Sequence, residues 1–196
     1  MKPSRQTFQR LGPDARRHAL IDACARVLAT KGASGASVRA ICAEAGVSPG
    51  LLTHYFSGVN DLVAATYEAT GRAVDAALEA AVNGAESPSA RLIAYLTASF
   101  RAPISDPALL ATWLAFWSLA RTDPAIAALH TRIYGGYRMR LEQLIADCVP
   151  GDQRLAAIGL TALVDGLWLE LSLGDAPFSA DDAAAIVAHW VELSGI

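Results

Sequence analysis

The stretch SVRAICAEAGVSPGLLTHYF, residues 37–56, decides how the N-terminal part of this chain folds. Its first half carries apolar residues at the spacing of one helical face, at Val38, Ile41, Cys42 and Ala45. Ser37 stands directly before that face, where a helix takes its N-cap, and Gly46 follows it, where a left-handed residue ends a helix. These signals predict a short helix that is closed at both ends.

A second short helix is predicted after a tight turn. Ser48 and Pro49 place a capping side chain and a proline at its start. Leu52 and Phe56 lie four residues apart and, with Val47, can pack back on the preceding helix. Two short helices joined by a turn with glycine are the pattern of the DNA-binding helix-turn-helix.

Helical patterns continue on both sides of this stretch. A helix over 13–31 precedes it and ends at Gly32, and a long helix over 59–83 follows the turn at Ser57 and Gly58. Further helices are predicted over 88–100, 107–121, 124–148, 152–173 and 179–193, the last with a capping box of Ser179 and Asp182. We therefore expect an all-α chain of about nine helices, with a three-helix helix-turn-helix domain over 1–58 and a second helical domain over 59–196.

Charge is distributed unevenly along the 196 residues. Residues 1–60 hold eight Lys or Arg and three Asp or Glu, a net charge of +5, whereas residues 61–196 hold eight and sixteen, a net charge of −8. A basic end on an acidic body suits a protein that meets a polyanion at one end only. The basic arm over 1–12 is expected either to reach DNA phosphate or the minor groove, or to be a frayed terminus.

Composition and spacing disfavour several other classes of protein. Three cysteines without a C-x-x-C pair and four scattered histidines favour buried thiols and no metal site. No apolar window spans a bilayer and no secretory signal is present, so we expect a cytoplasmic protein without a membrane partner. No nucleophile motif, metal constellation or phosphate loop points to an enzyme, and no cofactor is expected.

The first third of the chain resembles the DNA-binding domain of TetR-family transcriptional repressors. The matching features are an apolar helix over 15–31, the glycine after it, the stretch 37–56 and the aliphatic start of the next helix at Leu62 and Val63. The chain departs from the family at two positions, because many members carry lysine where Val59 stands and often tyrosine where Thr53 stands. The missing lysine shifts the expected phosphate contacts to Arg39, His54, Tyr55 and the arm.

The resemblance implies that side chains turned away from the core of the two short helices contact DNA. Leu51 is expected to touch a thymine methyl group, and Arg39 to bond a guanine or a phosphate. His54 and Tyr55 resemble the family positions that bond phosphate. The full set of DNA-binding candidates is Ser37, Arg39, Ser48, Pro49, Gly50, Leu51, Thr53, His54 and Tyr55.

Aromatic residues gather in two motifs of the second domain. TWLAFW at 112–117 and DGLWLE at 165–170 contain three of the four tryptophans, and Tyr134 and Tyr137 lie between them. Both motifs, their order and the HYF at 54–56 resemble BetI-type regulators, the TetR-family repressors of choline-to-betaine genes. The resemblance implies a C-terminal ligand-binding and dimerisation domain, with choline or another quaternary ammonium as the effector.

The chemistry of these residues is compatible with such a ligand. A quaternary ammonium makes no hydrogen bonds, so proteins hold it by aromatic faces and balance its charge with a carboxylate. The ligand-binding candidates are Trp113, Phe116, Trp117, Tyr134, Tyr137, Asp165 and Trp168. A carboxylate within an apolar helix needs a partner, which for Asp165 is either a cationic ligand or a protein arginine. The other interpretation of the aromatic residues is core and interface packing.

The last two helices carry more apolar surface than one core needs. Two such hairpins from two chains would form a four-helix bundle. One helix-turn-helix reads few bases, so a two-fold dimer on a palindromic site doubles the contacts, and the family resemblance implies the same homodimer. The candidate interface residues are Leu155, Ile158, Ala162, Leu169, Ile186, Val187 and Trp190.

We therefore expect a homodimeric repressor that binds double-stranded operator DNA and releases it when a small effector binds. One alternative keeps this class but takes an uncharged or lipophilic effector; loss of the response on Asp165→Asn would favour the cation. More remote alternatives are a helical enzyme and a protein-interaction module, and salt-dependent DNA binding would exclude the latter.

Overall fold

The computed structural model of the chain describes residues 12–196, which form nine α-helices and one short 3-10 helix, without any β-strand. The predicted all-α architecture is therefore confirmed. The expectations for the basic arm fall almost wholly on residues 1–11, outside the described residues. The elements are α1 (Pro13–Gly35), α2 (Val38–Ala45), α3 (Pro49–Tyr55), α4 (Val59–Asn83), α5 (Pro88–Thr97), η1 (Ala98–Phe100), α6 (Pro107–Ala120), α7 (Pro124–Ala146), α8 (Arg154–Leu173) and α9 (Ala180–Leu193).

Local signals place the ends of the first helices. The backbone N–H of Ala40 donates to the Ser37 hydroxyl at 3.2 Å, and Gly46 has a φ of 66°, so α2 is closed at both ends as predicted. In α1 the regular helix breaks at Gly32, whose φ is 65°, and one further turn continues to Gly35. The kink stands where the end of the helix was predicted.

The predicted capping of α3 by Ser48 is wrong. The Ser48 side chain makes no hydrogen bond to the first turn of the helix. The backbone N–H of Leu51, which a capping hydroxyl would have satisfied, donates instead to the Ser48 carbonyl at 3.0 Å. Pro49 at the first helical position already lacks an N–H, so few free donors remain at this end.

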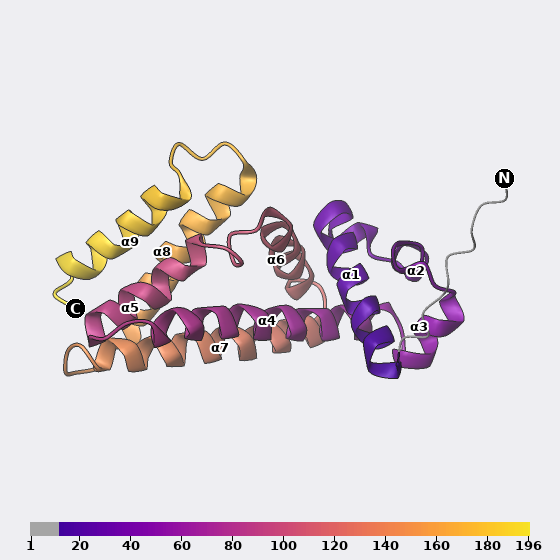
Figure 1. Cartoon of the computed structure of the whole chain (residues 1–196), viewed down its shortest axis with the longest axis horizontal. Coiled ribbons are helices and arrows are strands. Elements are labelled where there is room, and N and C mark those ends of the chain that lie inside the picture. The colour runs from indigo at the N-terminus through magenta and orange to yellow at the C-terminus, as the bar shows by residue number, and fades with distance from the viewer. Residues whose placement is uncertain (1–11) are drawn as a thin grey trace, which may run out of the picture.

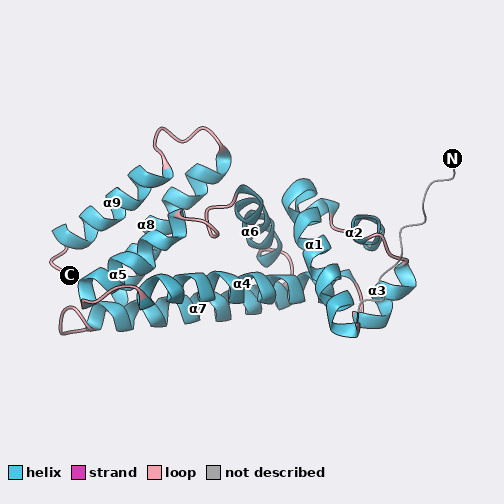
Figure 2. Cartoon of the chain, viewed as in Figure 1, coloured by secondary structure: helices cyan, strands magenta, loops and turns pink. Residues whose placement is uncertain are grey.

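The body of the molecule is built on two long helices that run side by side, α4 and α7 (Figures 1 and 2). Two ion pairs join them, Arg132 with Glu68, and Arg140 with Glu79 at 2.6 and 3.0 Å. A third link is the hydrogen bond of 2.9 Å between the Tyr67 hydroxyl and His130 Nδ1. Because the partners keep their order along both helices, α4 and α7 are parallel.

Helix α6 connects the body with the N-terminal helices. It packs against α1, α7 and α8. The Thr112 hydroxyl donates to the carbonyl of Ala25 in α1 at 3.2 Å as well as to Ala108 in its own helix at 2.8 Å. The next residue along, Trp113, faces the interior of the body, so neighbouring positions on α6 contact both halves of the chain.

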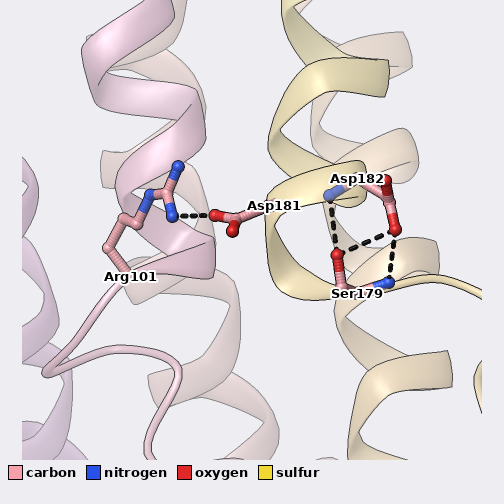
Figure 3. A network of polar contacts seen from close by, with 4 residues as sticks. All are labelled: Arg101, Ser179, Asp181 and Asp182. Atoms are coloured by element: carbon pink, nitrogen blue, oxygen red, sulfur yellow. Dashed lines mark hydrogen bonds and ion pairs between the residues drawn. The ribbon is translucent and has the colours of Figure 1, made fainter.

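Helix α9 is held by polar contacts at its N-terminus (Figure 3). The backbone N–H of Asp182 donates to the Ser179 hydroxyl at 3.1 Å, and the Ser179 N–H donates to the Asp182 carboxylate at 2.8 Å, which confirms the predicted capping box. The neighbouring Asp181 forms an ion pair with Arg101, which follows η1. The first turn of α9 is thereby tied to the loop between η1 and α6.

Helix α8 differs from the expectation that no apolar stretch of this chain is long enough to span a bilayer. By length and composition alone it is long and apolar enough to cross a membrane, and it is the one described helix that meets both criteria. Core helices of globular proteins meet them too. One face of α8 is buried in the body, at Ala157, Leu160, Thr161, Val164 and Trp168.

Candidate functional site

The outward faces of α2 and α3 form one continuous end of the molecule (Figure 1). Leu52 and Phe56, 0% and 3% exposed, point into the core and hold α3 against α1 and α2. The structure exposes the predicted DNA-binding residues at this end. Ser37, Arg39, Ser48, Pro49, Gly50, Thr53 and His54 are exposed, and Leu51 and Tyr55 are half-buried. Their contact with DNA stays a prediction.

The exposed cations at this end differ in whether they already have a partner. Arg26 of α1 pairs with Glu44 of α2 at 2.7 Å, and the Arg17 guanidinium stacks over the Phe56 ring at 5.0 Å. Arg39 forms no ion pair with any residue between 12 and 196. Its charge is therefore available to an anion from solution.

The side chains of α3 offer few free hydrogen-bonding groups. The helix, PGLLTHY, contains no Arg, Lys, Asn or Gln, the residues that bond bases in pairs of hydrogen bonds. The Thr53 hydroxyl donates to the Gly50 carbonyl at 3.2 Å, with the Pro49 carbonyl at 3.4 Å. Apart from His54 and Tyr55, α3 therefore presents mainly methyl groups and backbone.

A cavity of about 370 Å³ lies inside the body, between α4, α6, α7, α8 and the loop around η1. Five of the seven predicted ligand-binding residues line it: Trp113, Tyr134, Tyr137, Asp165 and Trp168. The remaining wall comes largely from positions that the sequence did not single out, on α4, within η1 and after it. These include Glu68, Gly71, Arg72, Val74, Asp75, Leu78, Ser99 and Ile104.

Phe116 and Trp117 do not line the cavity, and the prediction is corrected for both. Phe116 is fully buried and stacks on the Tyr67 ring, with centroids 4.1 Å apart and ring planes 10° from parallel. The Trp117 indole N–H donates to the Tyr134 hydroxyl at 3.0 Å from outside the cavity wall. Trp117 lies one turn of α6 beyond Trp113, about 5–6 Å further along the helix.

The Tyr134 hydroxyl is the centre of the polar contacts in the cavity wall. It accepts from the indole N–H groups of Trp113 at 3.2 Å and Trp117 at 3.0 Å, and it donates to Asp165 Oδ1 at 3.4 Å. Burial and the nearby Asp165 charge raise the pKa of Tyr134 well above its ordinary value. The hydroxyl therefore keeps its proton and remains a donor to the carboxylate.

Asp165 is a half-buried carboxylate without an ion pair to any residue between 12 and 196. Burial raises its pKa to about 6, against the opposing effects of the Tyr134 hydrogen bond and of the Arg138 charge. The Arg138 guanidinium stacks over the Tyr134 ring, with its Cζ 5.5 Å from the centroid. Of the two partners expected for Asp165, a protein arginine does not occupy the position.

Two further polar groups of the wall have no partner among the described residues. These are the indole N–H of Trp168 and the hydroxyl of Tyr137. The tryptophan rings pack at angles, Trp113 to Trp168 with centroids 6.3 Å apart and ring planes 81° apart. One carboxylate, several aromatic faces and two donors without a partner among the described residues thus line one space. Within residues 12–196 no three His, Cys, Asp or Glu side chains are grouped to hold a metal ion.

The predicted dimer residues divide into exposed and buried positions. Leu155, Ile158, Leu169 and Trp190 are 70%, 41%, 36% and 52% exposed, which is unusual for large apolar side chains. Ala162 is also exposed and Ile186 is half-buried. Val187 is 0% exposed, because it faces the protomer core, and is therefore removed from the interface candidates. Leu173 and Leu193, at 69% and 66% exposed, join the same helices' apolar surface.

Comparison with known proteins identifies both parts of the chain. Residues 20–66 match the model of bacterial regulatory proteins of the tetR family, and residues 88–194 match that of the BetI-type transcriptional repressor C-terminal domain. The HTH-type transcriptional regulator BetI of Rhizobium meliloti (strain 1021) is 36% identical over 180 residues, which cover 90% of this chain and 87% of that protein.

Solved structures agree with this result. A transcriptional regulator from Pseudomonas aeruginosa PAO1 superposes with a TM-score of 0.86 at 40% identity, over 95% of this chain and 93% of that one. A regulator from Saccharomonospora viridis, solved in complex with choline, has a TM-score of 0.80 at 18% identity, over 90% and 95% of the two chains. The second likeness concerns the fold alone.

Proposed function

Because this chain belongs to the TetR family of transcriptional regulators, with a C-terminal domain of the BetI type, we propose that it is a homodimeric repressor whose operator binding is relieved by a quaternary ammonium effector. The observation that carries the effector assignment is Asp165, a half-buried carboxylate without an ion pair in the described residues, on the wall of an aromatic cavity. The domains are taken as 1–58 for DNA and 59–196 for effector binding and dimerisation.

The DNA-binding part of the proposal is supported by the exposed end formed by α2 and α3. Arg39, which forms no ion pair within residues 12–196, supplies a cation for a guanine or a phosphate, and His54 and Tyr55 are the next candidates for phosphate. Leu51 and Thr53 present methyl groups, which match the methyl group of thymine in the major groove. We therefore assign sequence reading to Arg39, Leu51 and Thr53, and orientation to the phosphate contacts.

The effector part is supported by the chemistry of the cavity. A quaternary ammonium beside Asp165 neutralises the carboxylate and meets the faces of Trp113, Trp168 and Tyr134. Choline in the Saccharomonospora viridis regulator is a precedent for such a ligand in this fold. An uncharged lipophilic effector is the second candidate, favoured by the aliphatic part of the same wall, and it predicts a response that survives Asp165→Asn.

Dimerisation is assigned to α8 and α9. The large exposed side chains of Leu155, Leu173, Trp190 and Leu193 would be covered by the same helices of a second copy. Two reading helices related by a two-fold axis must lie about 34–36 Å apart to enter successive major grooves. A small change in their separation therefore weakens binding, and we assign its transmission to α6, which contacts the cavity through Trp113 and α1 through Thr112.

The proposed regulation is a linkage between two binding equilibria. An effector that binds one conformation of the body more tightly lowers operator affinity, and operator DNA must lower effector affinity by the same factor. A factor of 10–100 in affinity is typical, about 1.4–2.7 kcal/mol. The protein is assigned to the cytoplasm, where bacterial operators are found.

The test is binding to the DNA immediately upstream of the protein's own gene, at several salt concentrations, with and without choline. We expect saturable, sequence-preferring binding that weakens with salt and is weakened further by choline. Specific binding that is indifferent to choline and to tetramethylammonium would overturn the cation assignment and leave the repressor. Absence of specific binding at low salt, by a protein that is folded and dimeric, would overturn the DNA-binding assignment for this operator.

A further inference from the structure

The cavity is larger than a small quaternary ammonium requires. At roughly 20–30 Å³ per heavy atom, judged from the volume of water, choline fills on the order of half of a 370 Å³ space. Cavities of about 300–1,000 Å³ ordinarily hold drug-sized ligands. A cation held at Asp165 therefore leaves a second volume beside it.

A large part of the cavity wall is aliphatic. Val74, Leu78, Ile104, Leu129, Ile133 and Val164 line the cavity without contributing any side-chain polar atom. Leu78 and Ile104 are 2% and 3% exposed, so this wall is fixed by the core. A hydroxyl or carboxylate on the ligand would find no partner there, whereas methylene groups would leave water for an apolar surface.

The charges of the wall favour one positive group and no buried negative group. The other charged residues, Glu68, Arg72, Asp75 and Arg132, come from α4 and α7 and carry two charges of each sign. Glu68 and Arg132 neutralise each other in an ion pair, and Arg72 and Asp75 are exposed. The charge that remains on the wall is the half-buried Asp165 carboxylate, which would repel the carboxylate of a fatty acid.

We propose that the cavity is built for an amphiphilic cation, a quaternary ammonium that carries an aliphatic chain, with the ammonium group at Asp165 and the chain along Val74, Leu78 and Ile133. This inference rests on the proposed cation site and specifies the class of ligand that fills it. Choline binds as the head group alone and leaves the aliphatic half of the cavity empty.

Gly71 contributes to the shape of the aliphatic half. A Cβ atom at this position of α4 would lie 3.1 Å from the Ile133 side chain of α7, closer than ordinary contact. Glycine therefore allows the two helices to approach while the cavity between them stays open. Gly136 lines the cavity from the opposite helix and likewise adds no side chain to it.

The test measures affinity along a series of n-alkyltrimethylammonium salts, from tetramethylammonium to dodecyltrimethylammonium, by titration calorimetry below their micelle concentrations. We expect affinity to rise about threefold to fourfold for each added methylene until the cavity is full, and then to level off. Alkyl sulfates of the same lengths are the control, and they should bind at least tenfold more weakly because they lack the charge that Asp165 attracts.

Two variants test where the alkyl chain of the ligand lies in the cavity. Val74→Phe fills part of the aliphatic wall and should shift the levelling-off to shorter chains, with the tetramethylammonium affinity unchanged within twofold. Ala73→Phe adds the same ring at an exposed neighbouring position outside the cavity and should leave the whole series unchanged. Melting curves identify a variant that is not folded, and the wild-type series then decides the question alone.

The failures of this inference and of the proposed function are distinguishable. An affinity that does not rise with chain length, while choline and tetramethylammonium bind, overturns the amphiphile and leaves the cation site. Alkyl sulfates that bind as tightly as the ammonium salts of the same chain length also overturn it, because the alkyl chain alone would then drive binding. If no cation binds at all, the cation assignment fails and this inference fails with it.

Discussion

The DNA-reading surface and the effector cavity differ in where along the chain their residues originate. The nine candidates of the reading surface lie within residues 37–55 and stand exposed or half-buried on two short helices. The cavity wall is assembled from residues 68–168 on α4, α6, α7, α8 and the η1 loop, and most of its aromatic side chains are also core side chains.

Because of this difference, a substitution on the reading surface should change DNA binding without changing stability. A substitution in the cavity wall should change both ligand binding and stability. A side chain on the reading surface touches little of its own protein, so its removal affects DNA and leaves the fold. Trp113 and Tyr134 are 7% and 8% exposed and bond to each other, so changes there alter both the ligand site and the core. The five predictions below test this contrast, from the largest expected change in free energy to the smallest.

Phe116→Ala should lower the free energy of unfolding by about 3–5 kcal/mol, because it leaves a cavity under Tyr67 in the core. Urea unfolding at a fixed protein concentration measures this effect. Thr53→Ala on the reading surface is the control and should change stability by less than about 0.5 kcal/mol. Equal stability of the two variants would contradict the contrast.

Asp165→Asn should weaken choline binding by about 30–100-fold, or about 2–3 kcal/mol, because the ligand's charge loses its counter-charge in the cavity wall. Titration calorimetry at pH 8 measures the loss. Glu170→Gln is the matched control, since Glu170 lies five residues further along α8 and is exposed. Undiminished choline binding by the Asp165 variant would show that this carboxylate is not the counter-charge of the ligand.

The same variant should change how stability depends on pH in the absence of ligand. The folded-state pKa of Asp165, about 6, lies above its ordinary value of 3.8. Protonated Asp165 therefore favours the folded state at low pH, and this stability is lost as the pH rises through 6. Relative to Asp165→Asn, the wild type should lose about 2 kcal/mol of unfolding free energy between pH 4.5 and pH 8. A constant difference between the two proteins would exclude the raised pKa.

Arg39→Ala should weaken operator binding by about 1–3 kcal/mol and leave stability unchanged, because Arg39 has no ion pair within the described residues. Fluorescence anisotropy over a range of salt concentrations separates the two possible contacts. A phosphate contact lowers the salt slope by about one, whereas a guanine contact relaxes the preference at one base pair. Arg121→Ala, an exposed arginine of the body, should match the wild type.

Replacing thymine by uracil at the operator positions under α3 should weaken binding by about 0.5–1 kcal/mol per methyl group, because each replacement removes one apolar contact. Anisotropy with the substituted duplexes measures the loss. Leu51→Ala should lose the discrimination at the position that Leu51 reads. Equal sensitivity to uracil in the wild type and in this variant would remove Leu51 from sequence reading.

The contrast between the two regions also explains which predictions from sequence held. The cap at Ser37, the turn at Gly46, the interruption of the first helix at Gly32, where its end was predicted, and the capping box at Ser179 depend on hydrogen bonds or φ angles within a few residues. Ser48 failed despite a local signal, because a backbone carbonyl can satisfy the same donor that a side chain would cap. Local sequence patterns thus predict the helices and their ends well. They predict less well whether a backbone N–H donates to a side-chain oxygen or to a nearby carbonyl oxygen.

The cavity was only partly predictable. Asp165 and the tryptophans were visible as unusual residues in apolar helices, but motif membership did not distinguish Trp113, which lines the cavity, from Phe116 and Trp117, which do not. Val187 was assigned to the surface although it is fully buried. Gly71 and Ile133, which lie close together in the structure, are 62 residues apart in the sequence. No pattern in the sequence around either residue predicts their contact.

The sequence by itself determined the nine α-helices of residues 12–196, the family and the composition of the reading surface, because caps, glycines and apolar periodicity act between residues that are close along the chain. Only the tertiary structure decided which aromatic rings enclose a ligand and that Asp165 stays without an arginine partner among the described residues. Those properties depend on how α4, α6, α7 and α8 pack. The space left between packed helices depends on all of their side chains together, so no single stretch of the sequence predicts it.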